Sequence, residues 1–215
     1  MTLTSTSYTR RYYDEHVAAG LDYAVYGDWQ RDYGRWFVDA LGLRGRVLLD
    51  VGCACGALAH GFEEAGAVLC HGVDLCEHMI QAGRNRWPTL RLDVCDCVNL
   101  HLFNDATFDA IHSAQVAEHW QPHLVPCIFL ELRRAIRMGG LFFCCMDTVE
   151  LFQRQGRDML REDPTHVCIR PLAWWDEQAE ANGWQRDVDA QSALREHPRS
   201  YIGRYDWDYR CWRAT

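Results

Sequence analysis

Hydrophobic and polar positions follow two alternating patterns along most of the chain. Short continuous apolar runs, typical of strands buried on both faces, alternate with segments whose apolar residues recur at helical spacing. The predicted strands cover residues 47–51, 67–73, 90–92, 108–112 and 141–146, and the predicted helices cover residues 58–65, 76–86, 126–137 and 171–181. Strands that alternate with helices of this length predict an α/β fold with a mostly parallel sheet and helices on both faces.

The two ends of the chain differ from this alternating centre. Residues 8–19 and 28–41 predict two tyrosine-rich helices, which we expect to form a cap over the open end of the sheet. Residues 201–212 predict the last, edge-pairing strands. Because no repeat or Pro/Gly-rich linker interrupts the chain, we expect one domain over residues 1–215. Its expected parts are cap helices at 1–44, a core at 45–148, and a substrate loop with the last strands at 149–215.

Composition removes several classes of protein. All 22 basic residues are arginine, so enzymes that need a Schiff-base lysine and P-loop NTPases are excluded. The formal net charge of −8 argues against a broad electrostatic grip on nucleic acid or on an anionic membrane. The sequence has no run of 18 apolar residues, and its first residues lack the apolar region of a signal peptide. We therefore expect a cytoplasmic protein that binds neither nucleic acid nor membrane.

The cysteines do not predict a metal site. There are 11 of them, and they lie within apolar runs, as Cys144 and Cys145 do, or in C-x-C pairs. Zinc-binding pairs have the spacing C-x₂-C, which is absent. We expect reduced and mostly buried thiols, and the sequence assigns no metal ligand.

A glycine-containing loop follows the first predicted strand. The segment runs from Asp50 through Gly52 and Gly56 into a predicted helix. In an open α/β sheet, ligands bind at the carboxyl ends of the strands, where glycine lets the backbone approach a ligand closely. Asp74 ends the second strand and is placed to accept both hydroxyls of a ribose. A dinucleotide site would have the pattern G-x-G-x-x-G, whereas this loop keeps only two outer glycines.

Together these features resemble the class I S-adenosylmethionine-dependent methyltransferases of the small-molecule branch, over about residues 45 to 148. The segment VLLDVGCACGAL resembles the family's first motif, whose backbone holds the methionine part of the cofactor. GVDLCEHMI resembles the second motif, and DVCDCVNL the segment that meets the adenine amino group. FDAIHSAQVAEHW resembles the fourth-strand motif, and RAIRMGGLFFCC the following helix end and fifth strand. The resemblance implies a seven-stranded, Rossmann-like sheet.

The resemblance also implies a site for S-adenosyl-L-methionine, with S-adenosyl-L-homocysteine as the product. Asp74 is expected at the ribose, and Leu75 and Met79 beside the adenine. Asp96 is expected at the adenine amino group, with Asp93 as the alternative. The full predicted cofactor set is Asp50, Gly52, Cys53, Ala54, Gly56, Asp74, Leu75, Met79, Asp96, Cys97 and Ser113.

The chain departs from the family pattern at two places. The central glycine of the usual D-x-G-x-G-x-G is Ala54, a change that costs little if its φ is negative. The usual Pro-Gly-Gly before the fifth strand is Met138-Gly139-Gly140, which we expect to affect the turn more than the activity.

Two histidines are the candidate catalytic residues, because neutral imidazole is available near pH 7. His119 follows the fourth strand, and His166 lies in an irregular stretch after the fifth strand, where this branch has its substrate loop. For each of them a structural role is the alternative. Trp174 and Trp175, which follow closely, are more often packing residues than recognition residues.

The expected reaction is in-line methyl transfer to a small molecule, with oxygen the first choice of acceptor atom and nitrogen the next. A nucleic-acid substrate is disfavoured because the chain has no basic stripe. With no lysine, any cation that grips a carboxylate is arginine or protonated histidine, and Arg35, Arg161 and Arg170 are the candidates.

Two alternatives stay open at this stage. One is a non-catalytic cofactor-binding or partner-binding protein on the same fold. The other is a soft-metal or arsenite methyltransferase that uses the loop cysteines Cys53, Cys55, Cys76, Cys95 and Cys97. A monomer and a homodimer are equally compatible with the sequence.

Overall fold

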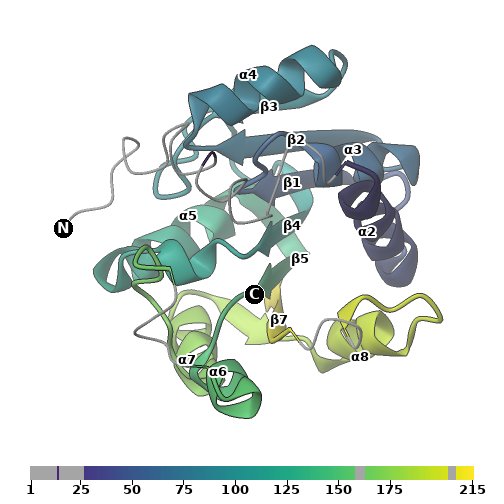
Figure 1. Cartoon of the computed structure of the whole chain (residues 1–215). Coiled ribbons are helices and arrows are strands. Elements are labelled where there is room, and N and C mark those ends of the chain that lie inside the picture. The colour runs from purple at the N-terminus through teal and green to yellow at the C-terminus, as the bar shows by residue number, and fades with distance from the viewer. Residues whose placement is uncertain (1–13, 15–26, 158–162, 203–206) are drawn as a thin grey trace. The chain divides into compact units, whose positions relative to one another are not determined.

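The computed structural model describes Asp14 and residues 27–157, 163–202 and 207–215 (Figure 1). Its strands belong to one seven-stranded mixed sheet, and helices pack on the strands. The predicted Rossmann-like α/β class is confirmed. The chain divides into two compact units, residues 1–97 and 98–215. The expected single domain, with its boundaries after residues 44 and 148, stays a prediction.

The first unit contains three parallel strands in the order β3-β2-β1. The strand β1 is buried along nearly its whole length, which explains its continuous apolar sequence. Helices connect each strand to the next, as parallel strands require. These elements are β1 (Val47–Val51), α3 (Ala57–Glu64), β2 (Leu69–Asp74), α4 (Glu77–Arg86) and β3 (Arg91–Val94).

The helix α2 (Gly27–Leu41) confirms the second predicted N-terminal helix and packs against α3 (Figure 1). The two backbones touch, because a Cβ atom on Gly34 would lie 2.4 Å from the carbonyl oxygen of Leu58. Tyr33 and Trp36, on the same helix, are buried. The first predicted helix, residues 8–19, lies outside the described residues, so the cap over the sheet stays a prediction.

The second unit contains four strands in the order β4-β5-β7-β6. The pair β4–β5 is parallel, whereas β7 pairs antiparallel with both β5 and β6. The strands are β4 (Phe108–Ala114), β5 (Ile136–Cys145), β6 (Trp184–Arg186) and β7 (Tyr209–Ala214). The helices are η1 (Ala117–His119), η2 (Pro122–Leu124), α5 (Val125–Ala135), α6 (Val149–Gln155), α7 (Leu172–Ala181) and α8 (Val188–Glu196).

Large aromatic side chains fill the core of the second unit. Phe142 on β5 packs against Trp184 and Trp212, with ring centroids 5.6 and 5.5 Å away. Both indole N–H groups have partners: Trp184 donates to the carbonyl of Phe129 and Trp212 donates to Asp176. Buried tryptophan therefore costs no unsatisfied donor at these two positions. No helix among the described residues is long and apolar enough to cross a membrane.

The start of β5 differs from the prediction. The helix expected over residues 126–137 ends at Ala135, and β5 begins at Ile136, ahead of Gly139 and Gly140. The pairing with β4 shifts here, because Phe108 pairs with Ile136 while Ala110 already pairs with Leu141. The glycines therefore lie in a bulge of the strand and do not end the preceding helix.

Five elements of the second unit were not predicted: the short helices η1 and η2, and α6, β6 and α8. The helices α6 and α8 each begin at a side-chain cap that is visible in the sequence. Thr148 Oγ1 accepts from the Leu151 N–H at 3.0 Å, and Asp187 Oδ1 accepts from the Ala190 N–H at 2.8 Å. Such caps favour a helix start even where the apolar periodicity is weak. An irregular stretch was expected after the fifth strand. Among the described residues of that stretch, only the part around His166 is irregular, because α6 occupies residues 149–155.

Candidate functional site

The glycine loop, residues 52–56, lies at the carboxyl end of β1 and is fixed by β2. The N–H groups of Gly52 and Cys53 both donate to the carbonyl of Val73, at 2.8 and 3.0 Å. Asp74 Oδ2 accepts from the Ala54 N–H at 2.8 Å, and Asp74 Oδ1 accepts from the Cys76 N–H at 2.8 Å. One carboxylate thus holds the loop and the start of α4 together.

Gly56 joins the glycine loop to α3. Its φ of 78° is left-handed, and a Cβ atom there would lie 2.7 Å from a Leu92 methyl group and 2.9 Å from one of Leu90. Glycine is therefore required at this position for both backbone and packing reasons. No side chain caps the start of α3. The first N–H groups of this helix form a region of partial positive charge at the end of the loop.

Ala54 does not have the negative φ that would make it a cheap replacement for the family's glycine. Its φ is 47°, in the left-handed region. A side chain in this region costs about 1–2 kcal/mol. The hydrogen bond to Asp74 and the packing of Ala54 against Cys55 and Met79 hold it in this conformation.

The other predicted cofactor residues differ in exposure and belong to both units. Leu75 is partly exposed and Asp96 is exposed, while the rival Asp93 forms an ion pair with Arg84 at 2.9 Å. Ser113 lies in β4 of the second unit, and Asp50, Cys53, Met79 and Cys97 are buried side chains of the first unit.

The loop cysteines do not form a metal-binding group. All 11 cysteines are described and form no disulfide, and those of the glycine loop and its neighbours are buried. Burial raises the pKa of the thiols of Cys53, Cys55, Cys76 and Cys97, so they stay protonated near neutral pH. No three of them converge as ligands among the described residues. The soft-metal alternative therefore gains no support from the structure.

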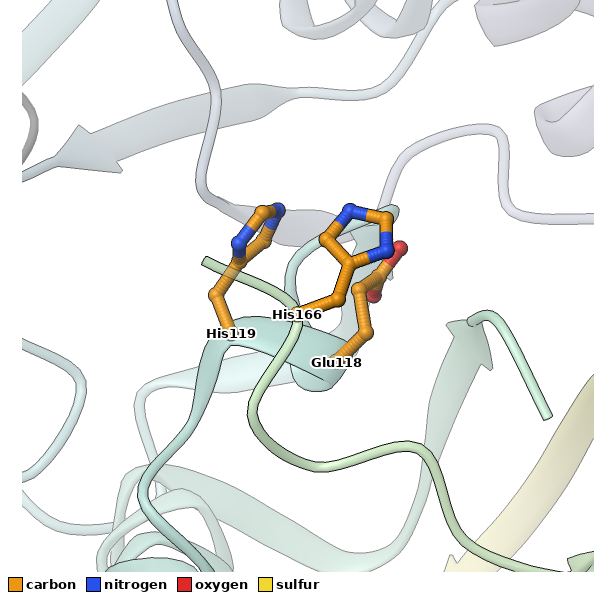
Figure 2. A group of neighbouring side chains, drawn as sticks. All are labelled: Glu118, His119 and His166. Carbon is orange, nitrogen blue, oxygen red and sulfur yellow. The ribbon is translucent and has the colours of Figure 1, made fainter. Parts of the chain in front are cut away.

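In the second unit, Glu118, His119 and His166 form a compact group that we call the histidine cluster (Figure 2). One candidate ligand atom from each residue lies within 4.8 Å of the other two. The two imidazole rings are 4.7 Å apart between centroids and nearly perpendicular, at 80°. Figure 2 shows the rings pointing toward one another, with the Glu118 carboxylate next to the ring of His166.

Two backbone attachments bring the partners of the histidine cluster together. Glu118 and His119 lie in η1, directly after β4, and His166 lies in the loop before α7. The Cys168 N–H donates to the carbonyl of Glu118 at 2.8 Å. On the other side of His166, Thr165 contacts the ring of His119. The loop is therefore tied to η1 both before and after His166.

Thr165 also fixes the tautomer of His119. Its hydroxyl donates to Asp163 Oδ1 at 2.6 Å and lies 2.9 Å from His119 Nδ1. A hydroxyl has one hydrogen, so it accepts from Nδ1, and the hydrogen-bond network assigns a proton to that nitrogen. In the neutral imidazole the lone pair is then on Nε2.

Carboxyl groups surround the histidine cluster. Glu118 is 0% exposed. The backbone N–H groups of Glu118 and Asp147 lie near enough to act on its carboxyl, but neither oxygen has a hydrogen bond of good geometry among the described residues. Burial, followed by the charge of Asp147, raises the pKa of Glu118 well above its usual range. The pKa of Asp163 is lowered: burial acts to raise it, but hydrogen bonds from Thr165 outweigh that effect.

Asp147 lies on the other side of His166. Its Oδ2 is 3.5 Å from His166 Nδ1 and 4.0 Å from a guanidinium nitrogen of Arg157. Asp147 is buried and directly follows Met146, at the end of the apolar run that forms β5. The sequence analysis missed Glu118 and Asp147 as site residues; the only local signal was that Glu118 directly precedes His119.

Two of the three predicted arginines have recorded partners. Arg35 pairs with Asp32 and Glu64 at the surface of the first unit. Arg170 lies over the ring of Trp174, 5.8 Å from its centroid. Trp175 is fully buried, as expected of a packing residue. Arg161 lies outside the described residues.

A family model for methyltransferase domains matches residues 48–140 of this chain. No curated protein matches the sequence. An S-adenosylmethionine-dependent methyltransferase from Mesorhizobium loti has a similar structure, with 19% identity and a TM-score of 0.62 over 82% of this chain and 95% of that one. The complex between the Trm112 methyltransferase activator and a putative methyltransferase from Haloferax volcanii contains a similar chain, with 18% identity and a TM-score of 0.65 over 94% and 97%.

A third similar structure is geranyl diphosphate C-methyltransferase from Streptomyces coelicolor, solved with Mg²⁺, geranyl diphosphate and S-adenosyl-L-homocysteine. It is 14% identical, with a TM-score of 0.64 over 86% of this chain and 78% of that one. At these identities the solved structures show the fold. The matched family model adds that residues 48–140 are similar to a methyltransferase domain.

Proposed function

We propose that this protein transfers the methyl group of S-adenosyl-L-methionine to a hydroxyl oxygen of a small molecule, with His119 and His166 activating the acceptor. The acceptor's part of the proposal rests on the fixed tautomer of His119, whose Nδ1 bonds to Thr165 and whose lone pair is on Nε2. A hydroxyl acceptor needs its oxygen activated before transfer, whereas a neutral amine does not. Nitrogen is the second choice of acceptor atom.

The residues of the first unit suit the cofactor. When bound, the cofactor supplies a methyl group on a positively charged sulfur. The uncapped start of α3 offers N–H groups to its carboxylate, and Gly56 keeps side-chain atoms away from that point. Asp74 and Asp96 are the proposed contacts to the ribose and to the adenine amino group. Asp74 is held in place by two backbone N–H groups, so it needs no rearrangement before a hydroxyl donates to it.

The two parts of the proposal are tested separately. Calorimetry with S-adenosyl-L-homocysteine measures cofactor binding, and transfer of a labelled methyl group to a panel of hydroxylated and amine-bearing metabolites measures turnover. We expect His119→Ala and His166→Ala to keep cofactor binding and to lower turnover by about 10²–10⁴-fold, as loss of acid–base or activating groups does. The matched control is His123→Ala, an exposed histidine of η2 in the same unit.

Three outcomes decide the proposal. Labelled methyl on oxygen, abolished in both histidine variants, supports it. Binding without turnover on any metabolite favours a non-catalytic cofactor-binding protein on the same fold. Absence of cofactor binding contradicts the proposal outright.

A further inference from the structure

Glu118 is the least satisfied side chain of the histidine cluster. It is fully buried, and neither oxygen has a hydrogen bond of good geometry among the described residues, although the backbone N–H groups of Glu118 and Asp147 lie nearby. Leaving a buried polar group unpaired costs about 1–3 kcal/mol, and more for a charged one. Buried polar groups are nearly always bonded, so an exception indicates a missing water, ion or ligand. The two imidazoles beside Glu118 favour an ion among these three.

From this geometry we propose that Glu118, His119 and His166 bind one divalent first-row transition-metal ion, of the Mn²⁺, Fe²⁺, Co²⁺ or Zn²⁺ type. Two imidazole nitrogens and one carboxylate form a ligand set that these ions favour, whereas Mg²⁺ and Ca²⁺ prefer oxygen ligands alone. The three ligand atoms lie within 4.8 Å of one another. Tetrahedral bonds of about 2.1 Å need ligand atoms about 3.4 Å apart. Small side-chain rotations close that gap.

Groups next to the two histidines can hold these proposed ligands in place. A ligating histidine usually donates its other ring N–H to an oxygen that fixes the ring. His119 does so through Nδ1 to Thr165, whose hydroxyl is bonded to Asp163. Near His166, the Oδ2 atom of Asp147 lies 3.5 Å from Nδ1. A carboxylate therefore lies close to each histidine, Asp163 through Thr165 for His119 and Asp147 for His166.

The neighbouring carboxyl groups also favour a cation. Glu118, Asp147 and Asp163 bring three carboxyl groups to one small region, where a guanidinium nitrogen of Arg157 lies 4.0 Å from Asp147. Three protein ligands leave coordination positions open for other donors, as in catalytic rather than structural metal sites. Oxygen atoms of an acceptor molecule suit those positions.

This inference deepens the proposed function, because the ion would activate the acceptor hydroxyl. The hydroxyl proton leaves to water, and a lone pair of the oxygen forms the new bond to the methyl carbon. The carbon–sulfur bond breaks with its electron pair on sulfur, which yields S-adenosyl-L-homocysteine. A bound ion favours this step because it stabilises the oxygen after the proton has left.

Metal binding is measured on the full chain without any methyl transfer. The protein, carrying Cys127→Ser to remove its exposed thiol, is freed of metal with a chelator and titrated with Co²⁺, followed by visible absorption, and with Zn²⁺ by calorimetry. We expect one ion per chain. Glu118→Gln and His166→Ala should each weaken binding by about 100-fold or more, and Thr165→Val by about 10–100-fold, because second-layer partners have effects of that size. His123→Ala is the matched control and should bind as the parent does.

Binding of S-adenosyl-L-homocysteine by each variant shows that it is folded. Absence of a saturable site, or a site that survives both Glu118→Gln and His166→Ala, overturns the metal proposal. One-to-one binding that these two variants abolish supports it, even if no acceptor is methylated. Methyl transfer by a protein that binds no metal leaves the proposed function standing and removes the ion from it.

Discussion

The glycine loop and the histidine cluster differ in how their polar groups are satisfied. In the loop, the N–H groups of Gly52, Cys53 and Ala54 all bond to groups of the same unit, and Asp74 is fixed by two of its neighbours. In the cluster, neither oxygen of the fully buried Glu118 has a hydrogen bond of good geometry among the described residues. The N–H groups of residues 52–54 are bonded without a ligand, whereas the cluster has the chemistry of a site that a ligand completes.

This difference has consequences for mutation. Substitutions in the loop should lower stability and cofactor binding together, because the same contacts serve both. Substitutions in the cluster should lower activity or metal binding more than stability, because functional sites often carry groups that do not help the fold.

The largest expected effect comes from Gly56→Ala. The new side chain meets both the left-handed φ of 78° and the methyl groups of Leu90 and Leu92. We expect a loss of about 2–5 kcal/mol in the free energy of unfolding, from backbone strain and overpacking together. Denaturant unfolding measures it. Gly42→Ala is the matched control, with φ 63° and nothing within 4 Å of the added atom, and should lose only the strain. Equal losses at the two positions would contradict this account.

The next effect is that of Asp74→Asn. An amide keeps one acceptor and places a donor against a backbone N–H, so one of the two bonds from Ala54 and Cys76 is lost. We expect about 2 kcal/mol less stability and about 30-fold weaker binding of S-adenosyl-L-homocysteine. Unfolding and calorimetry measure the two. Asp93→Asn, at a half-exposed ion pair with Arg84, should change neither by much. A strong effect of Asp93→Asn would instead favour that residue at the adenine.

Thr165→Val tests the cluster, because it removes the hydroxyl between Asp163 and His119 without changing the volume much. We expect a loss of about 1 kcal/mol in stability and a fall of about 10-fold in methyl transfer. Thr165→Ser restores the hydroxyl and should restore turnover. Failure of serine to restore turnover would show that Thr165 acts through packing and not through its hydrogen bonds.

The smallest expected effect is that of Ala54→Gly. Glycine relieves the left-handed strain but gains freedom in the unfolded chain, so the two terms nearly cancel to within about 0.5 kcal/mol. Ala106→Gly, at an exposed alanine with φ 51°, gives the same balance without loop contacts. A clear difference between the two variants measures the packing of Ala54 against its loop neighbours.

The elements that form the glycine loop were predictable from the sequence, and the histidine cluster was predictable only in part. The glycine loop is contiguous in sequence, and the strand and helix on either side of it carry strong periodic patterns, so its elements were predicted to within a few residues. The cluster depends on contacts between η1 and a loop 46 residues further along, at Thr165. Chain spacing does not reveal such a contact. Histidine is an evident candidate for catalysis, but a carboxylate such as Glu118 becomes one only when its burial is known.

Helix boundaries show the same limit. The caps at Thr148 and Asp187 were visible but carried too little apolar periodicity to predict α6 and α8. Gly139 and Gly140 look like a helix stop, but they lie in a bulge because the register of β5 against β4 decides their conformation. Local sequence predicts what a segment prefers, and pairing with a distant strand can override that preference.

Cys127 on α5 has a practical consequence. Ten of the 11 thiols are buried, and Cys127 alone is exposed, so a nitroxide or fluorophore should attach at one place in the native protein without removal of any other cysteine. The chain has no lysine side chain to compete for such a reagent. A nitroxide at Cys127 and a paramagnetic ion in the same unit would form a spin pair within one chain. Magnetic resonance could then follow binding of the ion, with no cysteine substitution needed for labelling.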